Sequence, residues 1–358
     1  MEYRLLQEDE FGQAIELADG VFREEGHVSM GEAFPHVFSP AFNQSYGAFE
    51  DKTLVAFIGL VPSVICSENA EIQAYSIGAV CTHPDYRKRG IGTHLLKQVF
   101  AHIQKAGASI LFVSGDLPIY KKAGCTYYGE VYRYDLHPGS LESNRKYTVR
   151  ELLPYDWFHI RKLSHNRPVR YEQSLFELAL LRQSAGFASI FKAKQNVLVA
   201  EEDGVEKGFL VMTTPTQEEN QAFSRVIEWG GEPKAITSLL AESFRFGMDT
   251  LRVKVPWFET KLIESLDSLN KIKTAYPGTI KIMDLDILLE QLAPYFEGKI
   301  TISSTDANQK QLTWKQHSIT VENQMLEQMI LTGEHGLDYD FSGIFPVPLP
   351  YPEGLNYV

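Results

Sequence analysis

A strand, a basic glycine turn, a helix and a second strand follow one another between residues 75 and 113. The first strand is "YSIGAVCT" (75–82), and "HPDYRKRGIG" (83–92) makes the turn. Apolar residues then recur at helical spacing, which predicts an amphipathic helix over about 90–106 that Gly107 ends. The apolar run "SILFV" (109–113) is typical of a strand covered on both faces. Together these segments predict a right-handed β-α-β unit, and therefore an α/β (α+β) fold.

The turn itself predicts an anion site. The first N–H groups of a helix lack partners within the helix, and the helix dipole adds partial positive charge there. Glycines at this end let a ligand approach the main chain, so a pyrophosphate fits, and basic side chains add charge-assisted bonds. The predicted site comprises Arg87, Lys88, Arg89, Gly90, Ile91, Gly92 and Thr93. Taken alone, the motif also fits a solvated turn before an ordinary surface helix.

Two other phosphate-binding motifs do not fit this turn. A Walker A loop requires a Lys-Ser or Lys-Thr pair after its last glycine, whereas the chain continues with Thr93 and His94. The dinucleotide fingerprint requires three glycines, and the turn has Gly90 and Gly92 only.

The second half of the chain repeats the plan of the first half. An opening strand and helix are indicated by residues 147–165, a hairpin by residues 197–212, and a strand-helix-strand unit by residues 225–256. Where the first copy has its basic turn, the second has only "GGEPKAI" (230–236). From about residue 276 the pattern changes again, to short strands and helices, one of them capped by Asp284 or Asp286. The repeat predicts one anion site, not two.

Composition narrows the function classes. The net charge of −12 and pI of about 5.4 disfavour a nucleic-acid binder, while acidity can attract cationic amines. The three cysteines, Cys66, Cys81 and Cys125, lack metal-ligand spacing, so we expect no metal and a reducing cytoplasm. The start "MEYRLLQEDE" is unlike a signal peptide, and no apolar run is long enough to cross a membrane.

The stretch "AVCTHPDYRKRGIGTHLL" (79–96) resembles the acetyl-CoA motif of the GNAT superfamily of N-acetyltransferases. The match is Arg87-x-x-Gly90-x-Gly92, after a strand that ends in a turn at Pro84. "SGDLPIYKKAGCTYYG" (114–129) is similar to the family's next segment, which contains a tyrosine, here Tyr120. The three-part layout resembles the Eis-like (enhanced intracellular survival) subgroup, which has two tandem GNAT folds and a C-terminal domain similar to sterol carrier proteins.

The resemblance implies an organisation and an activity. The implied domains are 1–146 with the acetyl-CoA site, 147–275 without a cofactor motif, and 276–358, whose tail reaches the active site. The implied reaction is direct attack of a primary amine on the acetyl-CoA thioester, with an aminoglycoside, a polyamine or a peptide amine as acceptor. It also implies a homo-oligomer, with a hexamer as one form. The alternative is a non-catalytic protein that senses acetyl-CoA or carries a lipid.

The resemblance also implies roles for particular residues. Main-chain groups of the strand Val80, Cys81 and Thr82 would pair with the pantetheine arm, and an N–H near Val80 would stabilise the oxyanion. The phenol of Tyr120 is the candidate acid for the departing thiolate, because a pKa near 10 keeps it protonated at neutral pH.

The base is less determined by the sequence. In the subgroup it is the chain's own terminal carboxylate, which Val358 would supply here. A frayed tail is the usual fate of terminal residues, but "FPVPLPYPEGLNYV" (345–358) is rich in apolar residues and stiffened by proline. Asp116, Glu25 or a water chain are the alternatives. Glu24 and Glu25, in the segment where the family has its acceptor-side loop, either attract a cationic acceptor or are solvated surface acids.

Overall fold

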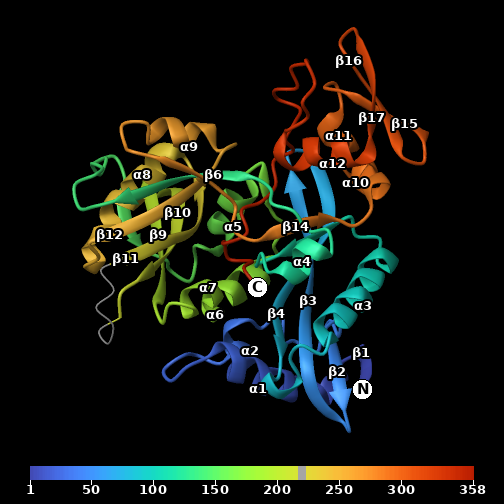
Figure 1. Cartoon of the computed structure of the whole chain (residues 1–358). Helices are drawn as coiled ribbons and strands as arrows, with labels where there is room; N and C mark the ends of the chain where they lie inside the picture. The colour runs from blue at the N-terminus through green and yellow to red at the C-terminus, as the bar shows by residue number, and fades with distance from the viewer. Residues whose placement is uncertain (217–222) are drawn as a thin grey trace.

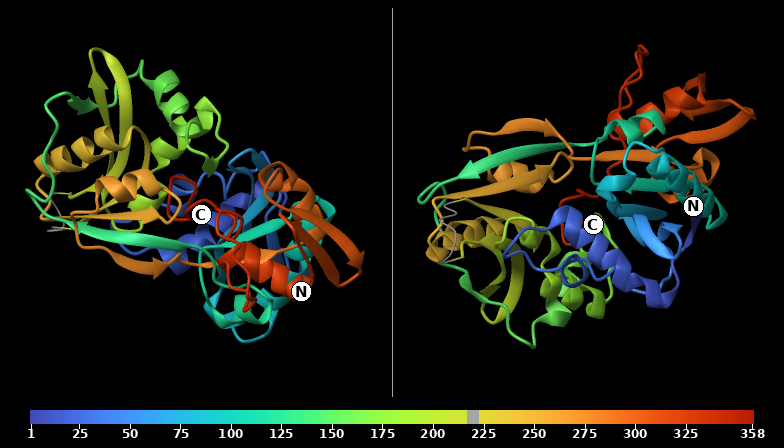
Figure 2. Two further views of the ribbon diagram at one scale, coloured as in Figure 1. Left: turned by 90° about the horizontal axis from the view of Figure 1, so that it is seen from above. Right: turned by 60° about the horizontal axis from the view of Figure 1, so that its bottom comes forward.

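The computed structural model describes residues 1–216 and 223–358 (Figure 1). Within these ranges the strands form two mixed seven-stranded sheets and one antiparallel three-stranded sheet. The first two sheets form two lobes, and the third sheet lies with its helices beyond one end of the first (Figures 1 and 2). The C-terminus lies between the two lobes in every view of the ribbon.

The first sheet has the strand order β1-β2-β3-β4-β5-β14, with β8 paired to the far end of β3. Phe57 packs toward helix α1 and its neighbour Ile58 toward α3, because successive residues of a strand point to opposite faces. The two helices therefore cover opposite faces of this sheet. Its strands are β1 (Glu2–Leu5), β2 (Tyr46–Glu50), β3 (Thr53–Ser67), β4 (Ala70–Thr82), β5 (Ile110–Val113), β8 (Val169–Tyr171) and β14 (Thr279–Ile282). Its helices are α1 (Phe11–Phe22), α2 (Met30–Ala33), α3 (Ile91–Lys105) and α4 (Pro118–Lys122), with 3-10 turns at Glu8–Glu10 and Pro84–Tyr86.

The second sheet has the order β7-β9-β10-β11-β12-β6-β13, which repeats that of the first. In each sheet the fourth and fifth strands of this series, β4 with β5 and β11 with β12, are parallel. Its strands are β6 (Glu130–Leu136), β7 (Thr148–Glu151), β9 (Lys194–Glu202), β10 (Val205–Thr214), β11 (Phe223–Gly231), β12 (Thr250–Pro256) and β13 (Ile272–Ala275). Its helices are α5 (Trp157–His165), α6 (Leu175–Ser184), α7 (Gly186–Ser189), α8 (Pro233–Glu242) and α9 (Thr260–Ser265), with a 3-10 turn at Ser243–Phe246.

The two sheets exchange strands. β6 follows the first lobe in sequence but pairs with β12 and β13 of the second sheet, while β14 follows the second lobe in sequence but pairs with β5 of the first sheet. Each exchanged strand covers an edge that would otherwise expose unpaired main-chain groups. The domain boundaries near residues 146 and 275 stay a prediction, because main-chain pairing crosses both positions.

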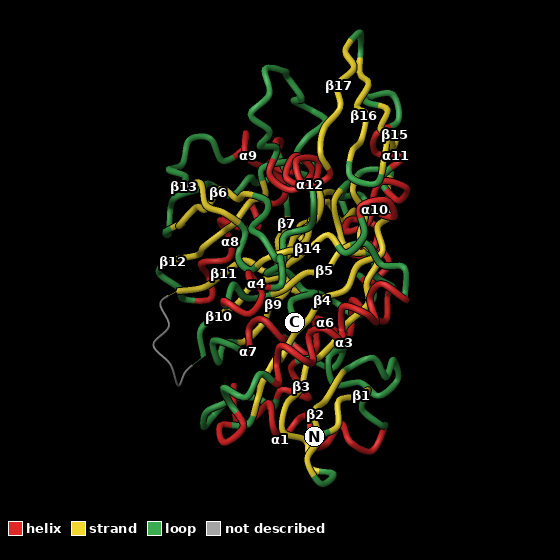
Figure 3. Tube along the Cα trace, turned by 45° about the vertical axis from the view of Figure 1, so that its right-hand side comes forward, coloured by secondary structure: helices red, strands yellow, loops and turns green. Residues whose placement is uncertain are grey.

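The third sheet consists of β15 (Thr301–Asp306), β16 (Gln309–Trp314) and β17 (His317–Glu322), beside α10 (Leu285–Gln291), α11 (Ala293–Phe296) and α12 (Asn323–Thr332) (Figure 3). The sequence did not predict β16. Its inward positions are Lys310, Leu312 and Trp314, and a lysine at a buried position hides the alternation. Lys310 is tolerated there because its ammonium group contacts Asp286 at 2.5 Å and Ser304 at 2.9 Å.

The central prediction for the first lobe is confirmed. The helix predicted over about 90–106 is α3, Gly107 follows it with a φ of +73°, and β4 and β5 are parallel. Of the two residues offered as a cap for α10, Asp284 accepts the Ile287 N–H at 3.0 Å. Among the described residues, no helix has the length and apolarity needed to cross a membrane.

Candidate active site

The pairing of β4 with β5 stops before β4 ends. It runs from Ala74 opposite Ile110 to Ile77 opposite Val113, whereas β4 continues to Thr82 while paired only with β3. The register between β3 and β4 shifts at this point, with Ala79 at a φ of +50°. Such a bulge bends a strand away from its neighbour. The main-chain edge around Val80 and Thr82 is therefore open on the β5 side.

The opening leads to the N-terminus of α3. Gly90 caps the helix with a φ of +76°, which favours glycine, and a Cβ atom there would meet no atom within 4 Å. A Cβ on Gly92 would contact Ile119 of α4 at 3.3 Å, so α4 closes the opposite side. Ile91 is buried and contributes only its main chain, while Thr93 is exposed. The space above Gly90 is free for an anionic ligand.

The three cations of the turn directly precede Gly90 in the chain and are exposed. The Arg87 Nε donates to the Thr82 carbonyl at 3.2 Å, which ties the turn to the end of β4. The Arg89 guanidinium donates to the Asp85 carbonyl at 2.8 Å and lies over the Tyr86 ring. Lys88 is exposed with a φ of +62°. None of the three forms an ion pair with a carboxylate of the described residues, so their charge is available to a ligand.

The cysteines are buried free thiols. Cys81 points into the core beneath α1, where burial raises its pKa to about 12, so only its main chain lines the opening. Burial likewise raises the pKa of Cys66 and Cys125. A buried protonated thiol is a poor nucleophile. The described residues also contain no cluster of three side chains that could hold a metal ion.

Tyr120 lies on α4 next to the end of β5. Its ring would be 3.5 Å from a Cβ on Gly115, and the side chain is buried. Burial raises the pKa of Tyr120 to about 12, and the neighbouring Cys125 adds to the shift. The phenol therefore stays protonated throughout the neutral range.

The alternative bases are less well placed. Asp116 is exposed, accepts the Tyr127 hydroxyl at 2.9 Å and lies 3.6 Å from the Lys121 ammonium. These two partners lower the pKa of Asp116, which weakens it as a base. Glu24 and Glu25 are exposed in the turn after α1.

The C-terminal residue lies against Gly78, where β4 leaves β5. A Cβ on Gly78 would be 2.6 Å from the carboxyl carbon of Val358, and its three nearest atoms would all belong to Val358. Val358 and Tyr357 pack against the core beneath α1. The structure thus brings the terminal carboxylate next to the strand that carries Val80 and Thr82. The tail is docked in the structure.

Aromatic rings from both lobes hold the last residues of the tail. The Tyr357 ring lies between Phe34, at 6.2 Å between centroids, and Phe187, at 5.3 Å. Burial raises the pKa of Tyr357, and a hydrogen bond with Ser114 at the end of β5 opposes that shift. Tyr357 therefore bridges α2, α7 and β5, one residue before the terminal carboxylate.

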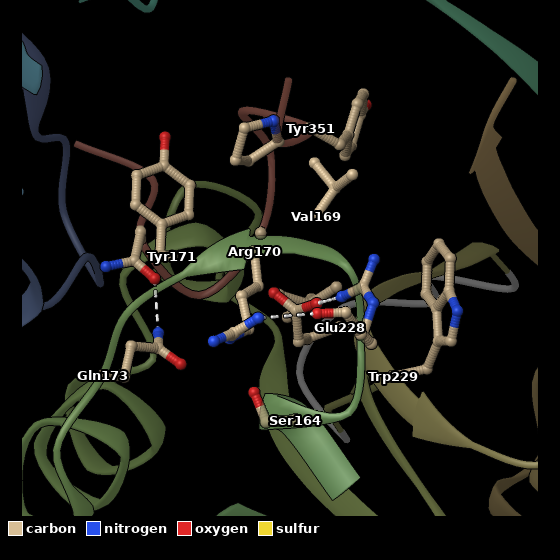
Figure 4. Close-up of a pocket in the computed structure, with 13 residues that line it drawn as sticks. Ser164, Val169, Arg170, Tyr171, Gln173, Glu228, Trp229 and Tyr351 are labelled. Carbon is tan, nitrogen blue, oxygen red and sulfur yellow. Dashed lines mark hydrogen bonds and ion pairs between the residues drawn. The ribbon is translucent and has the colours of Figure 1, made fainter. Parts of the chain in front are cut away.

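Earlier tail residues contact the second lobe. They lie where β11 separates from β12, which is the place equivalent to the opening between β4 and β5 in the first lobe. β11 pairs with β12 only as far as Arg225, and here the chain's own residues fill the gap (Figure 4). Arg167 bonds Glu259 at 2.9 Å and contacts Glu228, beside which Gly354 passes. A cavity of only about 20 Å³ remains.

The tail has one more contact near β8, and the start of α8 differs from the start of α3. The amide of Gln173 donates to Asn356, so the tail is held two residues before its end. At the start of α8, Glu232 and Pro233 stand where the first lobe has its glycines. An acid at this position disfavours an anion.

Residues 2–128 match the family model described as the acetyltransferase (GNAT) domain. The first part of the chain is therefore similar to GNAT acetyltransferase domains. GNAT enzymes use an acyl-CoA as co-substrate, and the first lobe fits one, since the strand opening leads to the free N-terminus of α3. No curated protein sequence matches the chain significantly.

Solved structures share the fold of the GNAT domain and of the lobes beyond it. A conserved Enterococcus faecalis protein of unknown function, described as a probable N-acyltransferase, is 14% identical, with a TM-score of 0.68. A GCN5-related N-acetyltransferase from Anabaena variabilis is 12% identical (TM-score 0.67), and so is Eis1 from Mycobacterium abscessus (TM-score 0.60). Each alignment covers 90% of this chain and 85% of the other. At this identity the likeness establishes the fold.

Several residues at this site were not predicted from the sequence. Gly78 receives the tail, Phe34 and Phe187 hold Tyr357, and Gln173 binds Asn356. None of them belongs to a motif, and their separation along the chain gives no signal that they meet. The apolar character of the tail, together with the Eis-like resemblance, indicated that it docks, but not which residues receive it.

Proposed function

We propose that the protein is an acetyl-CoA-dependent N-acetyltransferase that acetylates a primary amine. The main support is the gap between β4 and β5, which opens toward the N-terminus of α3, where no side chain caps the helix. The chain's own C-terminal residue lies beside the same gap, against Gly78. The diphosphate would lie over Gly90, and the pantetheine arm would extend the edge of β4 through the main chain of Val80, Cys81 and Thr82. An aminoglycoside, a polyamine or a peptide amine is the acceptor class.

The chemistry is a single transfer. The free amine attacks the thioester carbon, a C–N bond forms, the C–S bond breaks, and coenzyme A leaves. The Val80 N–H would stabilise the oxyanion of the tetrahedral intermediate. The amine proton would pass to the carboxylate of Val358, directly or through water. The proximity of that carboxylate to Gly78, at the start of the opening, supports this role.

Tyr120 would act on the thiolate. With a pKa of about 12, the phenol is a weaker acid than an ordinary tyrosine, so it holds its proton firmly. A hydrogen bond from it to the departing sulfur would stabilise negative charge there, and the thiol proton could then come from the base side or from solvent.

We also infer that the chain is Eis-like, with two tandem GNAT folds and a third domain similar to sterol carrier proteins. The repeated strand order and the two parallel strand pairs support the tandem folds. In the second lobe, Arg167 and the tail fill the gap between β11 and β12, which supports a single cofactor site in the chain. The homo-oligomer, and the hexamer as one form of it, stay predictions that light scattering of the purified protein tests.

The test is calorimetric binding of acetyl-CoA together with thiol release in the presence of an amine panel. We expect micromolar binding and turnover with at least one amine class. Binding without turnover across polyamines, aminoglycosides and peptides would favour the non-catalytic sensor, and absence of coenzyme A binding would overturn the proposal.

Neutralising the basic turn should weaken coenzyme A binding. We expect the triple change Arg87→Gln, Lys88→Gln, Arg89→Gln to raise the Kd for acetyl-CoA about 10- to 100-fold, because three charge-assisted contacts to phosphate are lost. Calorimetry measures it. Pantetheine, which lacks the diphosphate, should bind both proteins equally. Lys97→Gln, on the exposed side of α3, is the control, and an equal loss there would contradict the assignment.

Tyr120→Phe should lower kcat about 10²-fold, because a hydrogen bond to the developing thiolate is removed. The ring stays buried, so acetyl-CoA binding and the unfolding transition should not change. Since the pKa of Tyr120 is about 12, the wild-type rate should show no alkaline loss attributable to this group below about pH 10. Unchanged kcat in steady-state thiol release would exclude a catalytic role.

A further inference from the structure

A cleft of about 700 Å³ lies between the segment around α2 of the first lobe and α6 and α7 of the second. One wall is the segment around α2 and includes Gly31 and Glu32. The other wall runs from α6 through α7 to the start of β9 and includes Ser189, Lys192 and Lys194. Clefts between domains are the usual place for small-molecule sites.

The walls of this cleft also hold the tail. Phe34 follows α2 and Phe187 lies in α7, and both pack on the ring of Tyr357. Next to the lining residue Ala185, α7 meets α2 at Gly186, where a Cβ atom would be 2.8 Å from the Ala33 carbonyl. The elements that line the cleft therefore also hold Tyr357, the residue that precedes Val358.

The cleft is basic, in contrast to the chain as a whole. Lys192 and Lys194 form no ion pair with any described residue, and Glu32 is the only acid among the described residues that line the cleft. Arg23 adds charge behind the wall, where it donates to the Ser189 hydroxyl at 3.0 Å. Its Nε is buried without a partner in the described chain. Lys192 is half-buried and Lys194 is exposed, and unpaired cations such as these favour an anionic ligand.

The neighbouring groove has the opposite character. It lies across Pro35 and Leu180, which line both hollows, and carries the carboxylates of Glu172 and Glu177. A polycation would prefer that groove. The basic cleft is lined by the same elements that hold Tyr357. It is therefore the better candidate for the binding site of the acceptor.

We propose that the acceptor amine belongs to a molecule with a carboxylate, an amino acid or short peptide, whose carboxylate binds Lys192 and Lys194. This rests on the proposed function and narrows its acceptor class. The acceptor amine would point inward, toward the gap between β4 and β5, where it attacks the thioester by the transfer given above. Val28, Pro35 and Leu180 would contact its apolar side chain. Polycationic acceptors would be repelled by the two ammonium groups.

Binding of an unreactive ligand tests the site without turnover. N-acetyl-Ala-Leu with a free carboxylate and its C-terminal amide are titrated by calorimetry into the protein saturated with coenzyme A. We expect the acid to bind about tenfold more tightly than the amide, with the preference falling at high salt. The double change Lys192→Gln, Lys194→Gln should remove the preference. Lys261→Gln, an exposed lysine on α9 without an ion pair, should preserve it.

Equal binding of acid and amide, or tighter binding of spermidine than of the acid, would overturn the inference. Spermidine binding that is lost in Glu177→Gln would assign the acidic groove instead. Turnover of Ala-Leu and of its amide tests the proposed acetyltransferase function separately from the inferred preference for an acceptor with a carboxylate. Acetylation without a carboxylate preference contradicts the inference alone, whereas acid-selective binding without acetylation of any amine contradicts the proposed function alone.

Discussion

Deletion of Val358 is expected to lower kcat for acetyl transfer by about 10²- to 10³-fold, since a positioned general base contributes this much. The shortened chain still ends in a carboxylate, but that group moves back by about 3.5 Å, the length of one residue. It therefore leaves its place beside Gly78. The cofactor turn is untouched, so the Kd for acetyl-CoA should stay within about threefold of wild type, a free-energy change below about 1 kcal/mol. Stopped-time thiol release and calorimetry measure the two quantities.

Two matched variants separate the carboxylate from the side chain. Val358→Ala keeps the carboxylate in place and should retain most activity, whereas one glycine added after Val358 should be as harmful as the deletion. If the extended chain and the deletion are both fully active, the terminal carboxylate is not the base, and a water chain becomes the leading alternative.

Gly78→Ala is expected to expel the end of the tail and lower kcat about 10²-fold, because a displacement of about 1 Å at a reacting centre can cost that much. The new methyl group would sit 2.6 Å from the carboxyl carbon of Val358, well inside van der Waals contact. Gly78 does not have a positive φ, so alanine suits the backbone. The unfolding midpoint should fall only slightly, because the nearest atoms all belong to the tail.

A double-mutant cycle checks that the substitution acts through the tail. In the protein that lacks Val358, Gly78→Ala should add almost nothing, since the group it displaces is already gone. Independent, multiplicative losses would instead indicate that Gly78→Ala disturbs the cofactor edge of β4. Partial proteolysis of residues 345–358 offers a second readout, because a released tail is more easily cut.

Local segments were predictable from the sequence where one physical rule dominates. Helix α3 follows from its apolar period, its end follows from Gly107, and the anion site follows from Gly90 and Gly92 at the start of that helix. The parallel pairing of β4 with β5 follows because a β-α-β connection leaves little choice. Strand β16 was missed because Lys310 is buried by a specific pair with Asp286.

Pairing between distant segments was not predictable in the same way. The transfer of β6 to the second sheet and of β14 to the first depends on which sheet edges remain open after both lobes form. An alternating or apolar strand carries no label for its partner. The acidic composition likewise suggested a cationic acceptor, whereas Lys192, Lys194 and Arg23 gather at one cleft.

The sequence by itself determined the cofactor turn and the β-α-β unit, because their geometry depends on neighbours within a few residues of each other. Only the tertiary structure decided that Val358 ends beside Gly78, that Tyr357 is held from both lobes, and which charges face the cleft. Those contacts join segments some hundreds of residues apart. Their free energy comes from burial and complementary shape, which exist only once the lobes have packed.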